Sequence, residues 1–200
     1  EPFRLDGVRA ILDLAGLDES ALQTPPAYPL DPHVHADLLR AGGARAPIRM
    51  DCSGKHAAML LTCVRNGWPV ESYLAADHPL QVLITRTFTE LTGAPPAETS
   101  VDGCGAPLLA TSLVGLARAI ASIADGTAGE GADRLVRAWS EHPDHVSGTG
   151  RAERDLMRAV PGLLAKTGAE SVHVVSLPDG SAAAVKIEDG AERPLHLVMA

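Results

Sequence analysis

The sequence is poor in aromatic residues and in basic charge, and it has no long hydrophobic run. Aromatic residues make up 3% of its 200 residues, and 25 Asp and Glu against 17 Lys and Arg give a formal net charge of −8. An acidic chain does not favour contact with phosphates, so we expect no nucleic-acid partner. No apolar stretch approaches the roughly 18 to 20 residues of a membrane span, and the first residues lack a signal-peptide core. We therefore expect a soluble, cytoplasmic protein without a membrane partner.

Cysteine and lysine are scarce as well. The three cysteines are Cys52, Cys63 and Cys104, and the three lysines are Lys55, Lys166 and Lys186. An odd number of cysteines in a chain of this size does not indicate a disulfide framework, so buried thiol, metal ligand and nucleophile stay open as roles. Cys63 lies in the middle of an apolar helical pattern, which favours a small core residue.

The hydrophobic periodicity predicts helices along most of the chain and strands near its end. Helices are expected over 5–15, 33–40, 57–65, 79–91 and 108–124, then in two segments ending near 142 and 160, and strands over 171–177, 182–187 and 195–199. The apolar content of 108–124 predicts a nearly buried central helix. We interpret residues 1–200 as a single α+β domain. Because the few strands leave sheet edges unpaired, we expect a fragment that is incomplete at both ends, and self-association as a homodimer is plausible.

The segment Cys52-Ser53-Gly54-Lys55-His56 carries a thiol, a hydroxyl, an amine and an imidazole at the expected start of a helix. Backbone N–H groups and the helix dipole at that end stabilise negative charge, which predicts a lowered pKa for Cys52. The segment is not a phosphate-binding loop, because His follows Gly-Lys and no glycine precedes it at the required spacing.

Two chemical roles remain open for this segment. Cys52 could be a nucleophile with Lys55 or His56 as its base, or Cys52, Lys55 and Cys104 could hold a metal ion. In the second case, the metal must hold the lysine amine in its neutral form. The plain alternative is that the two thiols are buried and the lysine is a surface charge.

A second cysteine has a similar setting in Asp102-Gly103-Cys104-Gly105-Ala106-Pro107, which we expect at the head of a helix. Its glycines permit close approach of the backbone to a ligand. Asp102 could bind a substrate ammonium group or a water, although Asp-Gly is also a common turn signal.

Two further residues are candidates on their own. Lys186 is flanked by apolar residues in an expected strand, and it could act as a base if its face of the sheet lines a cleft. Arg151 follows Gly148-Thr149-Gly150 and could bind a carboxylate, although this loop could equally be a flexible helix entry.

The segments 52–60, 101–107 and 148–151 together resemble the asparaginase II family of zinc-binding, rhizobial-type L-asparaginases. Ala159-Val160-Pro161-Gly162 and the segment 186–190 do so as well, and the likeness spans essentially the whole chain. The resemblance implies an α/β/α-like fold similar to that of serine β-lactamases and glutaminases, in which an antiparallel sheet is flanked by helices and the site lies between the helical region and the sheet.

The same resemblance implies an activity and a site. Cys52, Lys55 and Cys104 would hold a zinc ion with water in the remaining position. The reaction would be hydrolysis of the side-chain amide of L-asparagine to aspartate and ammonia, with a serine as nucleophile and a lysine that takes its proton. Lys186 matches that lysine, and the residues that would orient the substrate are His56, Asp102 and Arg151.

The chain departs from the family pattern at its beginning. Family members carry a Ser-x-x-Lys pair and a second serine ahead of the position that matches Glu1, and these residues are not in this sequence. We therefore expect that these 200 residues alone hydrolyse asparagine at no more than a background rate. The alternatives are a hydrolase with Cys52 as nucleophile and a non-catalytic protein that binds the ligand.

Overall fold

The structure is a computed structural model that describes residues 2–194 and 197–198. Over these residues the chain is α+β, with eight α-helices and two small antiparallel sheets, which confirms the predicted fold class. Contacts divide the chain into two compact units, Glu1–Thr85 with Thr99–Leu109, and Arg86–Glu98 with Ala110–Ala200. Among the described helices, none has the length and hydrophobicity needed to cross a membrane.

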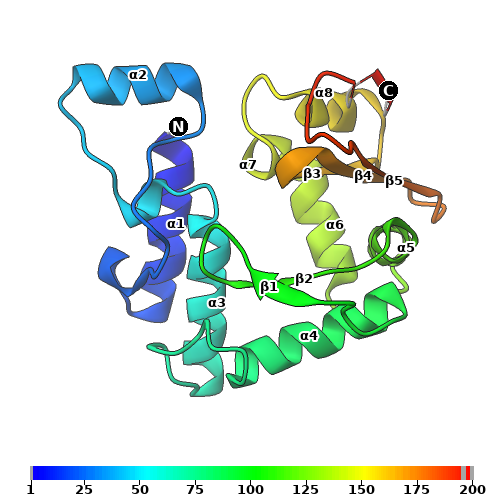
Figure 1. Cartoon of the computed structure of the whole chain (residues 1–200), viewed down its shortest axis with the longest axis horizontal. Helices are drawn as coiled ribbons and strands as arrows, with labels where there is room; N and C mark the ends of the chain where they lie inside the picture. Colours follow the sequence, from blue (N-terminus) through cyan, green and yellow to red (C-terminus); the bar gives the residue numbers. More distant parts are fainter. Residues whose placement is uncertain (1, 195–196, 199–200) are drawn as a thin grey trace. The chain divides into compact units, whose positions relative to one another are not determined.

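The elements of the first unit are mostly helical. They are α1 (Pro2–Ala15), α2 (Pro32–Arg40), α3 (Ser53–Asn66), the 3-10 turns Glu19–Ala21 and Pro47–Arg49, the first half of α4 (Pro79–Thr92), and the strands β1 (Thr99–Val101) and β2 (Pro107–Leu109). Helices α1 and α3 lie side by side (Figure 1).

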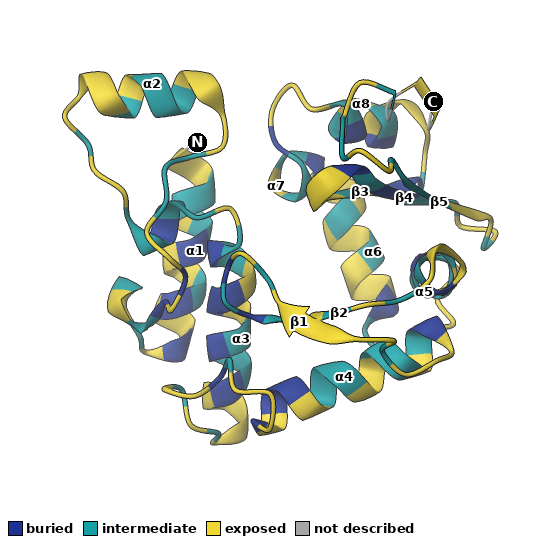
Figure 2. Cartoon of the chain, in the orientation of Figure 1, coloured by how far each residue is buried: buried dark blue, intermediate teal, exposed yellow. Residues whose placement is uncertain are grey.

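The core of the first unit lies between α1 and α3. Apolar residues of each helix recur on one face, as the helical repeat requires, and both helices carry buried bands in Figure 2. The core consists of Val8, Leu12, Leu22, Ile48, Ala57, Leu60, Cys63, Tyr73 and Leu80. Cys63 is fully buried there, as the sequence predicts.

Helix α3 begins one turn earlier than the expected residue 57. Cys52 is its N-cap and Ser53 its first residue, so the segment 53–56 forms the first helical turn. At the other end, Gly67 adopts a left-handed conformation with φ of 67°, which suits glycine at the end of a helix.

The expected helix over 108–124 begins at Leu113 instead, so the prediction is wrong for its first residues. Residues 107–109 form strand β2, which pairs with β1 in an antiparallel hairpin. Helix α5 (Leu113–Ala124) begins where the Ser112 hydroxyl accepts a hydrogen bond from the backbone of Gly115, a standard N-cap. The predicted near-complete burial is also wrong, because Val114 is 69% exposed.

The second unit contains a three-stranded antiparallel sheet in the order β3-β4-β5. Its elements are the second half of α4, then α5, α6 (Ala132–Glu141), α7 (Pro143–Val146), α8 (Ala152–Ala159), β3 (Leu164–Gly168), the 3-10 turn Ala169–Ser171, β4 (Val172–Ser176) and β5 (Ala182–Lys186).

Helices cover both faces of this sheet. Leu164 and Val174 point to one face and pack with Ile120 of α5. Because side chains alternate along a strand, the neighbouring Ala165 points to the other face, where it packs with Met157 of α8. The result is a helix–sheet–helix arrangement within this unit (Figure 1).

The strands differ from prediction in two places. Strand β3 was not expected, because the segment around Lys166 has a polar pattern, yet it pairs with β4 over its whole length. Of the expected strand over 195–199, residues 195, 196 and 199 lie outside the described residues. The described Val198 donates its backbone N–H to Pro194, a helical rather than a strand contact.

Candidate metal centre

Cys52 is placed at the N-terminus of α3 by the geometry of the helix start. It is the N-cap residue, its side chain is half-buried, and Lys55 follows in the first turn. Residues three apart on a helix lie on the same side, so the thiol of Cys52 and the amine of Lys55 leave the helix end in the same direction.

Cys104 and Asp102 lie in the loop of the β1–β2 hairpin, not at the head of a helix as the sequence predicts. The loop is closed by two backbone hydrogen bonds, from Asp102 N–H to Ala106 at 2.9 Å and from Gly105 N–H to Asp102 at 2.8 Å. Gly105 has φ of 88°, a left-handed conformation that favours glycine. This loop directs the fully buried Cys104 and the half-buried Asp102 toward the N-terminus of α3.

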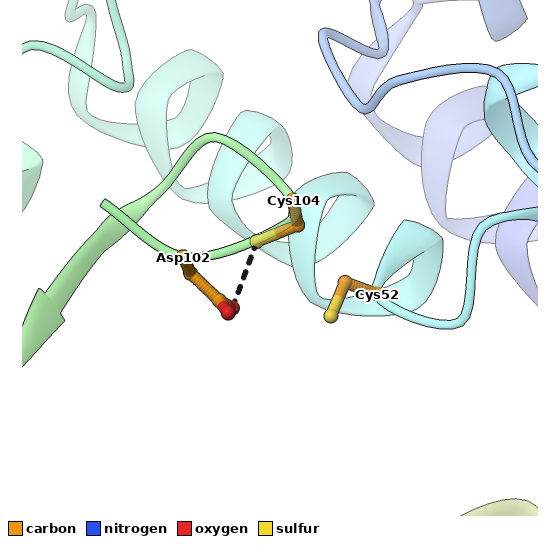
Figure 3. A group of neighbouring side chains, drawn as sticks. All are labelled: Cys52, Asp102 and Cys104. Atoms are coloured by element: carbon orange, nitrogen blue, oxygen red, sulfur yellow. Dashed lines mark hydrogen bonds between the residues drawn. The ribbon is translucent and has the colours of Figure 1, made fainter. Parts of the chain in front are cut away.

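These side chains converge at one point, as Figure 3 shows for Cys52, Asp102 and Cys104. Their ligand atoms all lie within 4.8 Å of one another, and Cys104 Sγ is 3.1 Å from Asp102 Oδ2. Lys55 Nζ is 3.3 Å from Cys104 Sγ and 3.4 Å from Asp102 Oδ2. Among the described residues, this is the single such cluster of His, Cys, Asp and Glu side chains.

The separations suit a tetrahedral zinc ion. With Zn–S bonds of about 2.3 Å, two thiolates on one ion are about 3.8 Å apart, and a thiolate and an amine slightly less. The amine lies 3.3 Å from the Cys104 sulfur, and the two sulfurs lie within 4.8 Å of each other, at most about 1 Å farther apart than on one ion. Thiolates are among the ligands that zinc prefers, and the lysine amine offers a nitrogen once it has lost its proton.

Burial, not the helix dipole, determines the protonation of Cys52. Burial raises the pKa of Cys52 to about 12; the positive charge of Lys55 opposes this, and the acid of Asp51 adds to it. The predicted lowering of this pKa is therefore wrong for the chain by itself. A thiol with this pKa is almost wholly neutral near pH 7 unless a cation replaces its proton.

Lys55 is charged in this setting. Partial burial lowers its pKa, but the neighbouring Cys104, Cys52 and Asp102 together raise it above the usual value for lysine. The amine must therefore lose a proton before it can act as a metal ligand or as a base.

His56 lies in the core beneath the cluster rather than at the surface. It is fully buried, its Nδ1 is 2.6 Å from the hydroxyl of Tyr73, and its Nε2 has no hydrogen-bond partner. The Tyr73 hydroxyl also accepts the backbone N–H of Gln23 at 3.2 Å, so it is free to donate to Nδ1. Burial, and then the charge of Lys55, lowers the pKa of His56 to about 4, so the ring is neutral.

Arg151 belongs to the second unit, where it is the N-cap residue of α8. Its Nε lies 4.0 Å from the carboxylate of Glu153, which is 1% exposed. Glu153 also accepts a hydrogen bond from the hydroxyl of Thr167 on β3. A buried acid therefore holds the Arg151 side chain near the start of the helix.

Lys186 is the last residue of β5, and its side chain is half-buried. It shares the face of Ala184, the face that packs against α5, because residues two apart on a strand point the same way. Its amine donates a hydrogen bond to the backbone carbonyl of Ile187.

Sequence reasoning missed two supporting residues. Tyr73 lies 17 residues after His56 in an irregular segment, and nothing in the local pattern signals the contact. Glu153 could have been found, because it occupies the buried stripe of α8 one turn before Met157, where an apolar residue is expected.

The site is a cluster of two thiols, an amine and a carboxylate in an α+β chain. The family model for L-asparaginase II matches residues 1–200. The chain belongs to the L-asparaginase II family, a family of asparaginase-type amidohydrolases. No curated protein matches the chain.

Proposed function

We propose that the chain acts in the hydrolysis of the side-chain amide of L-asparagine to L-aspartate and ammonia, with a zinc ion held by Cys52, Lys55 and Cys104. The observation that carries this proposal is the convergence of three donors from segments about fifty residues apart, within a chain that matches the L-asparaginase II family over its whole length. A bound zinc ion supplies a fixed positive charge and polarises a substrate oxygen.

The first unit contributes the metal ligands and Asp102. Because Asp102 Oδ2 lies 3.1 Å from Cys104 Sγ, it is close enough to hold a water or a substrate ammonium group beside the ion. In the metal-free chain the half-buried Asp102 is charged, because a hydrogen bond from the Cys104 thiol lowers its pKa. His56 is fully buried, so we infer that it orients the substrate through the helix turn that carries Lys55.

On the basis of the family resemblance we also propose roles for Arg151 and Lys186, which belong to the second unit. Arg151 would bind the substrate carboxylate, because a guanidinium can donate two parallel hydrogen bonds to a carboxylate. Lys186 takes the proton of the serine nucleophile in a Ser/Lys mechanism.

Two alternatives make different use of the same residues. In a thiol hydrolase, Cys52 would attack the amide with Lys55 or His56 as its base. The raised pKa values of Cys52 and Lys55 and the burial of His56 argue against this mechanism, because a neutral thiol would face a protonated amine. In a non-catalytic protein, the site would bind asparagine without turning it over.

The test is zinc content together with asparagine binding and ammonia release. Purified chain, dialysed after loading with zinc, is expected to hold one zinc ion, and Cys52→Ala and Cys104→Ala are each expected to lose it. Cys63→Ala is the matched control, because that thiol is buried in the core away from the cluster. Absence of zinc from folded wild-type chain contradicts the proposed metal site.

The remaining readouts separate the alternatives. Calorimetry with L-asparagine is expected to show binding that weakens in Arg151→Lys, because a lysine cannot make the bidentate contact. A second preparation joins this chain to the segment that carries the Ser-x-x-Lys pair in family members. Asparagine binding without ammonia release in that preparation identifies a non-catalytic protein. Loss of ammonia release on iodoacetamide labelling of Cys52, with zinc retained, identifies the thiol hydrolase.

A further inference from the structure

The thiols of Cys52 and Cys104 are close enough to react with each other. Their sulfurs lie within 4.8 Å, whereas Cys63 is enclosed in the helical core of the same unit. A disulfide bond is about 2.05 Å long, so the two sulfurs must approach by less than about 3 Å. A rotation of one cysteine side chain to another staggered position moves its sulfur by roughly that distance.

The surroundings of both cysteines permit this approach. Cys52 is half-buried at a helix end, so a small oxidant can reach its sulfur. Cys104 lies between two glycines, and a Cβ added at Gly103 would meet no atom within 4 Å. The side of the loop at Gly103 is therefore open, whereas a Cβ at Gly105 would meet Leu74 at 3.5 Å.

We propose that Cys52 and Cys104 form a reversible intramolecular disulfide, which makes this cluster a modification site whose oxidation excludes the metal ion. Formation of the bond does not depend on the proposed zinc site. Exclusion of the metal ion does rest on that proposed site. A sulfur that is bonded to another sulfur has no thiolate to offer a metal ion, so one oxidation removes two of the three ligands.

A small disulfide such as oxidised glutathione is the co-reactant. At alkaline pH, the fraction of Cys52 sulfur that has given up its proton attacks one sulfur of oxidised glutathione, which releases one glutathione as its thiol and leaves a mixed disulfide on Cys52. The sulfur of Cys104 then gives up its proton and attacks Cys52 Sγ, which releases the second glutathione. The protein loses two protons and two electrons, and oxidised glutathione gains them.

The test is incubation of the reduced 200-residue chain with oxidised glutathione in the presence of a chelator, followed by alkylation and intact-mass analysis. We expect a product lighter than the reduced chain by two hydrogen atoms, with Cys63 as the single residue alkylated after unfolding. Peptide mapping is expected to join the peptides that contain Cys52 and Cys104. Cys104→Ser is expected to stop at the mixed disulfide on Cys52, and Cys63→Ala is expected to behave like wild type.

A zinc arm tests exclusion of the metal. Zinc loaded beforehand is expected to slow oxidation at least tenfold. The oxidised chain is expected to bind no zinc until dithiothreitol reduces the disulfide and both thiols are available again. A mixed disulfide that persists in the wild type, or a disulfide that joins two chains on a non-reducing gel, overturns the inference. If the intramolecular bond forms but neither form binds zinc, the metal site fails and the disulfide stands, so the two failures are distinguishable.

Discussion

Neutral, buried His56 makes the folding stability of this chain depend on pH. Burial lowers its pKa from 6.5 to about 4. The unfolded chain therefore binds a proton at His56 between these two values while the folded chain does not, so folding stability falls as the pH falls. The stabilisation is fully present above about pH 6.5 and is lost at about pH 4.

The size of this effect follows from the pKa difference. At about 1.36 kcal/mol for each unit, the full difference corresponds to roughly 3 kcal/mol, of which roughly 2 kcal/mol is lost between about pH 7 and pH 5. For a chain of this length, a loss of that size lowers the melting temperature by about 4 to 8 °C. The acids Asp102 and Glu153 have lowered pKa values, so their contributions disappear mostly below this window.

The assay is urea unfolding of wild type and His56→Asn at a series of pH values, with a chelator present so that metal release does not contribute. Asparagine keeps an acceptor near the Tyr73 hydroxyl but does not titrate. We expect the wild type to lose roughly 2 kcal/mol more than the variant between about pH 7 and pH 5. His33→Asn, at an exposed position, is the matched control and is expected to follow wild type. Parallel curves for wild type and His56→Asn refute the reasoning.

Three other substitutions test separate contacts. Tyr73→Phe removes the partner of His56 and of the Gln23 backbone N–H, and we expect a loss of about 1 to 3 kcal/mol in urea unfolding; no loss contradicts the network. Gly105→Ala forces a left-handed alanine next to Cys104, so we expect a loss of about 1 to 2 kcal/mol in urea unfolding; an equal loss in Gly103→Ala contradicts this account. Glu153→Gln weakens the buried contacts of α8, and a melting temperature lower by several degrees is expected in calorimetry; an unchanged value contradicts a structural role.

The sequence predicted the first half of the candidate site because the chemistry there is local. Cys52 and Lys55 are three residues apart at a helix start, and that spacing alone places both groups on one side. The contribution of Cys104 could not be derived in the same way. Its glycine-rich setting was assigned to the head of a helix, whereas backbone pairing between β1 and β2 places it in a hairpin loop.

The errors in the fold have a common cause, which is that tertiary contacts outweigh local pattern. Strand β3 has a polar sequence around Lys166, and its pairing with β4 makes it a strand. The apolar helix α5 was expected to be buried all round, yet its first turn exposes Val114, because only one face meets the sheet. Tyr73 illustrates the same limit at the site, because no local pattern predicts which side chain lies beside a buried histidine.

The most direct measurement for the central claim is the absorption spectrum of the chain loaded with cobalt(II) in place of zinc. Thiolate ligands on cobalt(II) give an intense charge-transfer band, and a tetrahedral site gives strong visible bands. We expect both at one cobalt per chain, with the charge-transfer intensity about halved in Cys52→Ser and in Cys104→Ser and the visible bands altered in Lys55→Met. A cobalt spectrum of the weak, octahedral kind, or one that these substitutions leave unchanged, would contradict a metal site built from these residues.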